Sequence, residues 1–178
     1  KRQQQKESHE LRTLFWECTL RCNVACRHCG SDCRACVEQA DMPKEDFLRV
    51  IDSITPHVDT HRVFIIFTGG EPLMRKDLEI CGRELYRREY PWGIVTNGLH
   101  LSRQRLDSLL QAGMHSITVS LDGFEDAHNW LRCHPLSFQR ATEAIRMLTG
   151  EEEIIWDVVT CVNQNNIEQL PAFRDFLI

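Results

Sequence analysis

The chain has 178 residues, of which 42% are apolar, 26% charged and 8% aromatic. This length and composition are typical of one globular domain that can bury a core, and they exclude a disordered chain. The longest uninterrupted apolar run, Val63 to Phe67, is far shorter than the roughly 18 residues of a transmembrane helix. Residues 1–10 also lack the apolar stretch of a secretory signal. We therefore expect a cytoplasmic protein without a membrane span.

The formal net charge is −5, and the densest basic stretches, Lys1-Arg2 and Arg87-Arg88, are short. A nucleic-acid-binding protein would favour a clustered basic face. The charge pattern therefore argues against a nucleic-acid partner.

The first predicted elements follow a polar lead of residues 1–10. Leu11 to Cys18 is typical of a strand, and it delivers the chain into a cluster of cysteines. A helix is expected to start at 41–43, with Asp41 as its N-cap and Pro43 in its first turn, and to run to Ile54. The apolar run Val63 to Phe67 is then typical of a strand in a parallel sheet covered on both faces.

The remainder of the chain repeats this alternation. We expect strands at 93–96, 116–121 and 154–162 and helices near 77–88, 103–111, 138–148 and from 167 onward. The pattern predicts five β/α units in a parallel α/β sheet or barrel, with one domain over residues 11–178. Because the chain lacks an initial Met and stops after its fifth helix, we expect it to be most of a larger α/β domain.

Unusual residues follow the predicted strands. Chemistry in parallel α/β folds gathers in the loops after the carboxyl ends of the strands. Three cysteines follow the first strand, Gly69-Gly70-Glu71-Pro72 follows the second, residues 96–98 (TNG) the third and residues 120–123 (SLDG) the fourth. These segments are expected to face one rim of the sheet.

The chain has nine cysteines, of which six lie between Cys18 and Cys36. A disulfide framework belongs to small secreted domains, so bound metal explains the crowding better. Cys22, Cys26 and Cys29 have a C-x₃-C-x₂-C spacing, tight enough to converge on one inorganic centre with an open position. Iron–sulfur clusters are held by Cys thiolates, whereas zinc is the competing occupant through Cys26, Cys29, Cys33 and Cys36.

These motifs resemble those of the radical S-adenosylmethionine (SAM) enzymes, whose C-x₃-C-x₂-C loop is followed by a G-G-E-type motif after the second strand. Asn23 and the segments 96–98 and 119–123 (VSLDG) resemble the branch that usually carries a C-terminal SPASM domain, which includes peptide-modifying enzymes and sulfatase maturases. The resemblance covers residues 11–178 and implies a partial (β/α)₆ TIM-like barrel.

The resemblance also implies roles for single residues. Cys22, Cys26 and Cys29 would ligate a [4Fe–4S] cluster whose open iron chelates the amino and carboxylate groups of SAM, and His28 would pack near the adenine. At Gly69 and Gly70 the absence of a Cβ would let the backbone approach the SAM ammonium.

Further contacts with SAM are expected from the later loops. Glu71 would add a carboxylate near the ammonium, Ser120 would bond the ribose hydroxyls, and Arg132 would pair with the SAM carboxylate. Thr68 is a weaker candidate.

Several residues keep alternatives open. Asp122 and Asn97 are either turn formers or functional groups. Cys33 and Cys36 are expected to be exposed thiols, an auxiliary metal pair or a redox pair. His128 and His134 either line a substrate cavity or bond locally.

The implied activity is reductive cleavage of SAM to a 5′-deoxyadenosyl radical that abstracts a substrate hydrogen, from a peptide or protein in the first instance. The cofactors would carry the chemistry, and a flavodoxin or ferredoxin would supply the electron. A small-molecule maturase of the same superfamily and a non-catalytic zinc- or iron–sulfur-binding scaffold are the alternatives.

Overall fold

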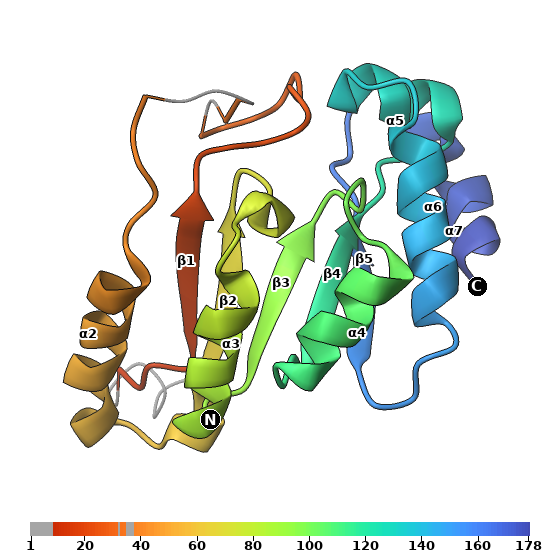
Figure 1. Ribbon diagram of the computed structural model, residues 1–178. Coiled ribbons are helices and arrows are strands. Elements are labelled where there is room, and N and C mark those ends of the chain that lie inside the picture. Colours follow the sequence, from red (N-terminus) through yellow and green to blue (C-terminus); the bar gives the residue numbers. More distant parts are fainter. Residues whose placement is uncertain (1–8, 32, 35–37) are drawn as a thin grey trace.

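The computed structural model describes residues 9–31, 33, 34 and 38–178. Its five strands are parallel and form one sheet in sequence order. They are β1 (Thr13–Thr19), β2 (Phe64–Gly69), β3 (Trp92–Thr96), β4 (Ser116–Ser120) and β5 (Ile155–Val159). Because β1 and β5 do not pair with each other, the sheet is open, and the predicted α/β fold with five β/α units is confirmed (Figure 1).

Helices form the connections between the strands. The α-helices are α2 (Lys44–Ile54), α3 (Leu78–Arg87), α4 (Arg103–Gln111), α5 (Glu125–Arg132), α6 (Ser137–Leu148) and α7 (Leu170–Leu177). Short 3₁₀ turns occur at η1 (Thr55–His57), η2 (Thr60–Arg62), η3 (Pro72–Met74) and η4 (Ile167–Gln169). None of the helices in the described part of the chain is long and apolar enough to cross a membrane.

One face of the sheet packs against the helices. Alternate strand side chains point to this face, since successive residues of a strand face opposite sides. Trp16 of β1 stacks on Phe47 of α2 with ring centroids 3.7 Å apart, and both meet the edge of Phe67 from β2. These rings belong to one continuous core that also takes in α3, α4, α6 and α7. The core fixes the sheet, and with it the loops at its carboxyl edge.

The opposite face is more open. Ile65 and Phe67 are fully buried beneath the helices, whereas Ile66, which points the other way, is half-buried. On the two outer strands Phe15 is 64% exposed and Ile155 is 74% exposed. The expectation that the second strand is covered on both faces is therefore met on one face only.

The structure corrects the expected start of the first helix. Asp41 is not its N-cap: α2 begins at Lys44, the N-cap position is Pro43, and no side chain caps the helix. The Asp41 carboxylate instead accepts a hydrogen bond from Thr19 Oγ1 at 2.7 Å and pairs with Arg21, both at the end of β1. Helix α5, between β4 and the predicted helix at 138–148, was not expected from the sequence.

Candidate active site

A cavity of about 180 Å³ lies at the carboxyl edge of the sheet, where the loops after β1, β2, β3 and β4 come together. These loops lie along the upper edge in Figure 1. Eight of the predicted site residues line the cavity: Cys22, Cys26, His28, Cys29, Gly69, Gly70, Ser120 and Arg132. The other lining residues are Val24, Cys33, Thr68, Val95, Thr96 and Asn97. Glu71 is the one predicted site residue that is absent from the lining.

The loop that carries the cysteines, residues 20–34, is closed on itself by backbone hydrogen bonds. The Cys22 N–H donates to the Arg34 carbonyl at 2.8 Å, and the Arg34 N–H donates to the Leu20 carbonyl at 3.3 Å. Arg34 thereby forms a parallel β-bridge with Arg21. The end of this cysteine loop is thus fixed beside its first cysteine.

Helix α5 holds the middle of the cysteine loop. The Arg27 N–H donates to the Leu131 carbonyl at 2.9 Å, and Arg27 Nε donates to the Trp130 carbonyl at 3.0 Å. The Arg27 guanidinium also lies over the Trp130 ring, 4.8 Å from its centroid. Because α5 carries Arg132 as well, this contact ties the thiols and the cationic side of the cavity together.

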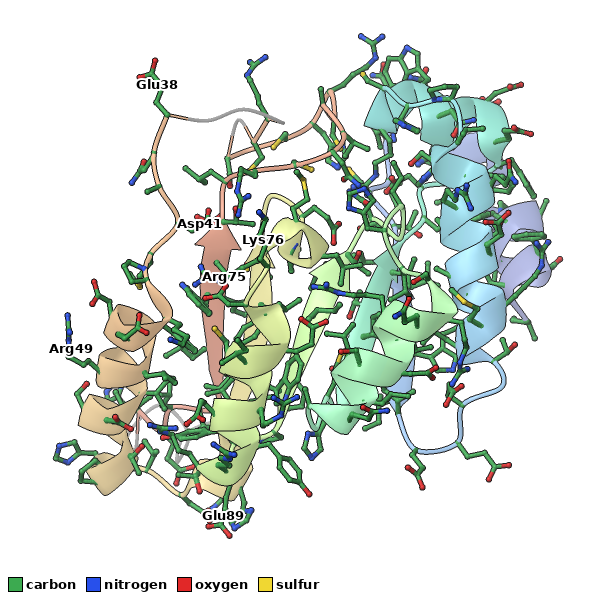
Figure 2. The ribbon with its side chains drawn as sticks, viewed as in Figure 1. Glu38, Asp41, Arg49, Arg75, Lys76 and Glu89 are labelled. Atoms are coloured by element: carbon green, nitrogen blue, oxygen red, sulfur yellow. The ribbon has the colours of Figure 1, made fainter. Side chains whose placement is uncertain are left out.

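The base of the loop is closed by Arg75, which is 3% exposed. Arg75 Nη1 donates to the Cys18 carbonyl at 2.7 Å, and Nη2 donates to the Met42 carbonyl at 2.9 Å. Figure 2 shows Arg75 and Asp41 together beside the end of β1. These charged groups join the chain that enters the cysteine loop to the chain that leaves it.

The three motif cysteines differ in their exposure. Cys22 is buried, Cys26 is half-buried and Cys29 is exposed. Burial raises the pKa of Cys22 to about 11. Burial also raises the pKa of Cys26, although the positive charge of Arg132 opposes the shift. Cys22 and Cys26 are therefore thiols at neutral pH in the metal-free protein, and a metal that binds them must displace their protons.

Gly69 and Gly70 pack closely against the backbone at the end of β1 and just after it. A Cβ on Gly70 would lie 2.1 Å from the Arg21 carbonyl oxygen, and a Cβ on Gly69, where φ is +114°, would lie 2.3 Å from the Thr19 carbonyl oxygen. The Gly70 N–H donates to that Thr19 oxygen at 2.7 Å. Both glycines line the cavity as predicted, and their lack of a Cβ also allows close packing against the start of the cysteine loop. Their approach to SAM stays a prediction.

Glu71 turns away from the cavity and is 1% exposed. Its carboxylate accepts hydrogen bonds from Thr96 Oγ1 at 2.7 Å, from the Asn97 N–H at 2.8 Å and from the Leu73 N–H at 3.1 Å. Burial raises the pKa of Glu71, and these three donors oppose the shift. Glu71 therefore joins the loops after β2 and β3, and we assign it to positioning Asn97.

Asn97 leads from Glu71 to the first cysteine. Its side-chain Nδ2 donates to Asn23 Oδ1 at 2.7 Å and lies 3.9 Å from Cys22 Sγ. Asn23 Nδ2 is buried and has no hydrogen-bond partner within the described residues. The amide groups of Asn97 and Asn23 thus lie next to the first cysteine.

Arg132 stands on the other side of the thiols, with its side chain 11% exposed. Its Nε donates to Asp122 Oδ2 at 2.7 Å, and its Nη1 lies 3.8 Å from Cys26 Sγ. The predicted cation is therefore in the cavity, and a fully buried carboxylate already holds it. A charged donor beside a thiolate stabilises the thiolate form.

Asp122, for which the sequence left open a role as a turn former or as a functional group, is the centre of a buried hydrogen-bond network. Its Oδ1 accepts the Cys161 N–H at 2.8 Å, its N–H donates to His128 Nδ1 at 2.9 Å, and its carbonyl accepts from Asn166 Nδ2 at 2.7 Å. His128 Nε2 lies 2.9 Å from Ser137 Oγ, so His128 bonds locally and does not line the cavity. Burial alone would raise the pKa of Asp122, but His128, Arg132 and the Cys161 N–H hold it well below its usual range.

The last two predicted residues complete the rim. Ser120 ends β4 and is 7% exposed. His28 lies in the cysteine loop, where partial burial and then the charge of Arg132 lower its pKa. Neutral His28 therefore adds a polar aromatic ring to the cavity without a second positive charge.

The family model of the Radical SAM superfamily matches residues 16–177, which is nearly the whole chain. The chain belongs to the Radical SAM superfamily. This family uses a [4Fe–4S] cluster and SAM. The predicted family and cofactors are thereby confirmed.

Curated relatives and solved structures extend the comparison. The chain is 28% identical to "Fe-coproporphyrin III synthase" of Methanosarcina barkeri over 92% of its length, and 30% identical to "AdoMet-dependent heme synthase" of Oleidesulfovibrio alaskensis over 94%. It spans 40% and 42% of the length of these two relatives.

Among solved structures, Streptococcus suis SuiB bound to precursor peptide SuiA matches with a TM-score of 0.78 at 15% identity, over 99% of this chain and 39% of that one. "Native anSMEcpe with bound AdoMet" matches with a TM-score of 0.76 at 18% identity, over 92% of this chain and 47% of that one. These two likenesses concern the fold.

The residues present fit an iron–sulfur cluster. Three thiols from one short loop line the same cavity, and so does Asn97, whose amide nitrogen lies 3.9 Å from Cys22 Sγ. In the part of the chain that the structure describes, no three His, Cys, Asp or Glu side chains are grouped to hold a single metal ion. Cys36, one of the four thiols in the zinc alternative, lies outside the described residues, as do residues 1–8 of the predicted lead.

Proposed function

We propose that this chain is the core of a radical SAM enzyme in which Cys22, Cys26 and Cys29 hold a [4Fe–4S] cluster and the remainder of the cavity holds SAM. When bound, the two cofactors supply reductive cleavage of SAM to methionine and a 5′-deoxyadenosyl radical, which takes a hydrogen atom from the substrate. The observation that carries the proposal is that thiols, glycine backbone, Ser120 and Arg132 line one cavity.

The side chains of this cavity bind and orient. Arg132, held by Asp122 through Nε, offers its terminal guanidinium nitrogens to the SAM carboxylate, and Ser120 offers a hydroxyl to the ribose. The apolar side chains of Val24 and Val95 exclude water from the same space. None of these groups needs to transfer a proton.

The proposed substrate is a peptide or protein, in line with the likeness to SuiB, a structure of which holds a precursor peptide. The predicted SPASM branch and the flavodoxin or ferredoxin reductant belong to the same proposal. A second candidate, maturation of a small-molecule cofactor, is favoured by the two sequence relatives above, which are named for heme and Fe-coproporphyrin III synthesis and are 28% and 30% identical. Titration of the full-length protein with Fe-coproporphyrin III, followed by its visible absorbance, separates the two candidates.

The activity is tested with cluster-loaded, dithionite-reduced protein extended to its natural length. It is expected to convert SAM into 5′-deoxyadenosine and methionine slowly even without substrate. The variant with Ala at Cys22, Cys26 and Cys29 is expected to form none, whereas Cys81→Ala, a thiol of the main core, is the matched control that retains it. Failure of the iron-loaded protein to cleave SAM would favour the non-catalytic scaffold.

A further inference from the structure

We propose that Cys33 is a fourth iron ligand, which binds the cluster iron left open by the three motif cysteines until SAM displaces it. The inference rests on the proposed function, because it requires the cluster. It is carried by position: Cys33 lines the same cavity as Cys22, Cys26 and Cys29. Cys33 is 4% exposed, so it is not one of the exposed thiols that the sequence allowed.

The backbone holds Cys33 in this position. Its neighbour Arg34 is bonded in both directions to the chain around the first cysteine, through the Cys22 N–H and the Leu20 carbonyl. The Cys33 N–H itself donates to Cys29 Sγ at 3.4 Å. The backbone at Cys33 is thus held next to Cys22 and Cys29 by contacts that do not involve the Cys33 sulfur.

The Cys33 sulfur makes only weak contacts within the protein. The sulfur lies 3.8 Å from the Ser31 carbonyl and also contacts the Cys29 thiol, and both contacts are weak because a thiol is a weak donor and a weak acceptor. Purely structural cysteines of this chain, such as Cys18 and Cys81, lie in the main core under the sheet, whereas Cys33 packs in a separate small cluster with Cys22 and Val24. Cys33 is therefore not needed for the main core.

The lining of the cavity offers few competitors for the open iron. Among the described lining residues there is no carboxylate, since Glu71 is turned to Thr96 and Asn97. Apart from the cysteines, His28 is the described lining side chain that could ligate iron. Iron–sulfur clusters are held mainly by Cys thiolates, and a buried thiol fixed beside two motif cysteines is the better placed donor.

The proposed exchange is a ligand substitution without electron transfer. As the iron–sulfur bond of Cys33 forms, the thiol proton passes to solvent. When the amino and carboxylate groups of SAM bind the same iron, that bond breaks and the Cys33 thiolate takes a proton back. In the absence of SAM, Cys33 would cover the iron and protect the cluster from oxygen.

The test compares wild-type protein with Cys33→Ala and with Cys33→Ser, which keeps the size of the side chain. The full-length proteins are reconstituted anaerobically, and their iron content is measured. Without SAM, the EPR spectrum of the reduced cluster is expected to differ between wild type and both variants, and the variants are expected to lose their brown absorbance severalfold faster in air. With saturating SAM the spectra are expected to coincide. Cys81→Ala is expected to behave as wild type throughout.

Three results would overturn the inference. Identical spectra and bleaching rates in wild type and the Cys33 variants would remove Cys33 from the iron. Loss of the cluster from both variants even with SAM would make Cys33 a permanent ligand instead. A wild-type spectrum that changes in His28→Phe but not in Cys33→Ala would assign the position to His28. A wild-type chain that takes up no iron contradicts the proposed function itself, and the iron measurement reveals that case separately.

Discussion

The two walls of the cavity are held in different ways. The cysteine loop is held chiefly by backbone hydrogen bonds and by the close approach of Gly69 and Gly70. Two arginine side chains add to this: Arg27 on the surface and the buried Arg75 at the base of the loop. The opposite wall, from Ser120 to Arg132, is held by a buried carboxylate that collects a charged side chain and backbone groups. The three thiols are therefore positioned mainly by backbone contacts, whereas the Arg132 cation is positioned by a network of side chains.

The two walls are therefore expected to be sensitive to different kinds of substitution. A backbone frame tolerates most side-chain changes and fails where a Cβ is forced into it. A buried charge network fails when one charged partner is removed, because the other is left buried and unpaired. The predictions below test the two walls separately.

The largest effect is expected from Asp122→Ala. The change leaves the Arg132 guanidinium and the Cys161 N–H without their acceptor, and breaking a buried ion pair typically costs roughly 3–5 kcal/mol. Denaturant unfolding of the variant measures this loss. Asp107→Ala, which removes an exposed partner of Arg103, is the matched control and is expected to cost less than about 1 kcal/mol. Equal losses would contradict the account of the Asp122 network.

A smaller but still clear effect is expected from Gly70→Val. The new Cβ would collide with the Arg21 carbonyl, and overpacking of this kind typically costs about 1–3 kcal/mol. Because the same backbone leads into Cys22, iron uptake on reconstitution is expected to fall along with the free energy of unfolding. Gly30→Val has open space around it and is expected to change neither quantity. Normal iron uptake by a folded Gly70→Val protein would show that the cysteine loop does not need the close approach of Gly70 to bind iron.

Acid unfolding tests whether Asp122 stabilises its wall of the cavity through its negative charge. The pKa of Asp122 is lower in the folded chain than in the unfolded chain, so its contribution to stability is present above the ordinary aspartate pKa of about 3.9 and is lost as the pH falls. The difference in free energy of unfolding between wild type and Asp122→Asn is therefore expected to shrink from about pH 5 to about pH 2. A difference that stays constant over this range would show that Asp122 does not act through its charge.

The smallest effect is expected from Arg27→Ala. The variant loses the stacking on Trp130 and the hydrogen bond to the Trp130 carbonyl but keeps the backbone bond to Leu131. An exposed cation–π contact is worth about 0.5–1 kcal/mol, so a modest fall in melting temperature with retained iron uptake is expected. Arg49→Ala, on the outer side of α2, is the control. Complete loss of iron uptake in Arg27→Ala would show that side chains, not backbone, hold the cysteine loop.

The β/α alternation and the three cysteines could be predicted because their signals are local. Apolar runs such as Val63–Phe67 mark the strands, and the C-x₃-C-x₂-C spacing lies within eight residues. Helix α5 was missed because it is short and its buried face includes His128, which does not mark an apolar stripe.

The network around Asp122 depended on distant partners. Cys161 and Asn166 lie 39 and 44 residues further along the chain, and no local pattern reveals such pairs. The orientation of Glu71 could not be predicted for the same reason. Its partners Thr96 and Asn97 lie at the end of a different strand, 25 and 26 residues further along the chain.

The central claim is that Cys22, Cys26 and Cys29 together hold one iron–sulfur cluster, and metal analysis of anaerobically reconstituted protein tests it most directly. The account predicts about four irons per chain with matching sulfide in wild type and none in the variant with all three cysteines replaced by Ala. One or two zinc ions per chain without iron, or iron retained by the triple variant, would contradict it.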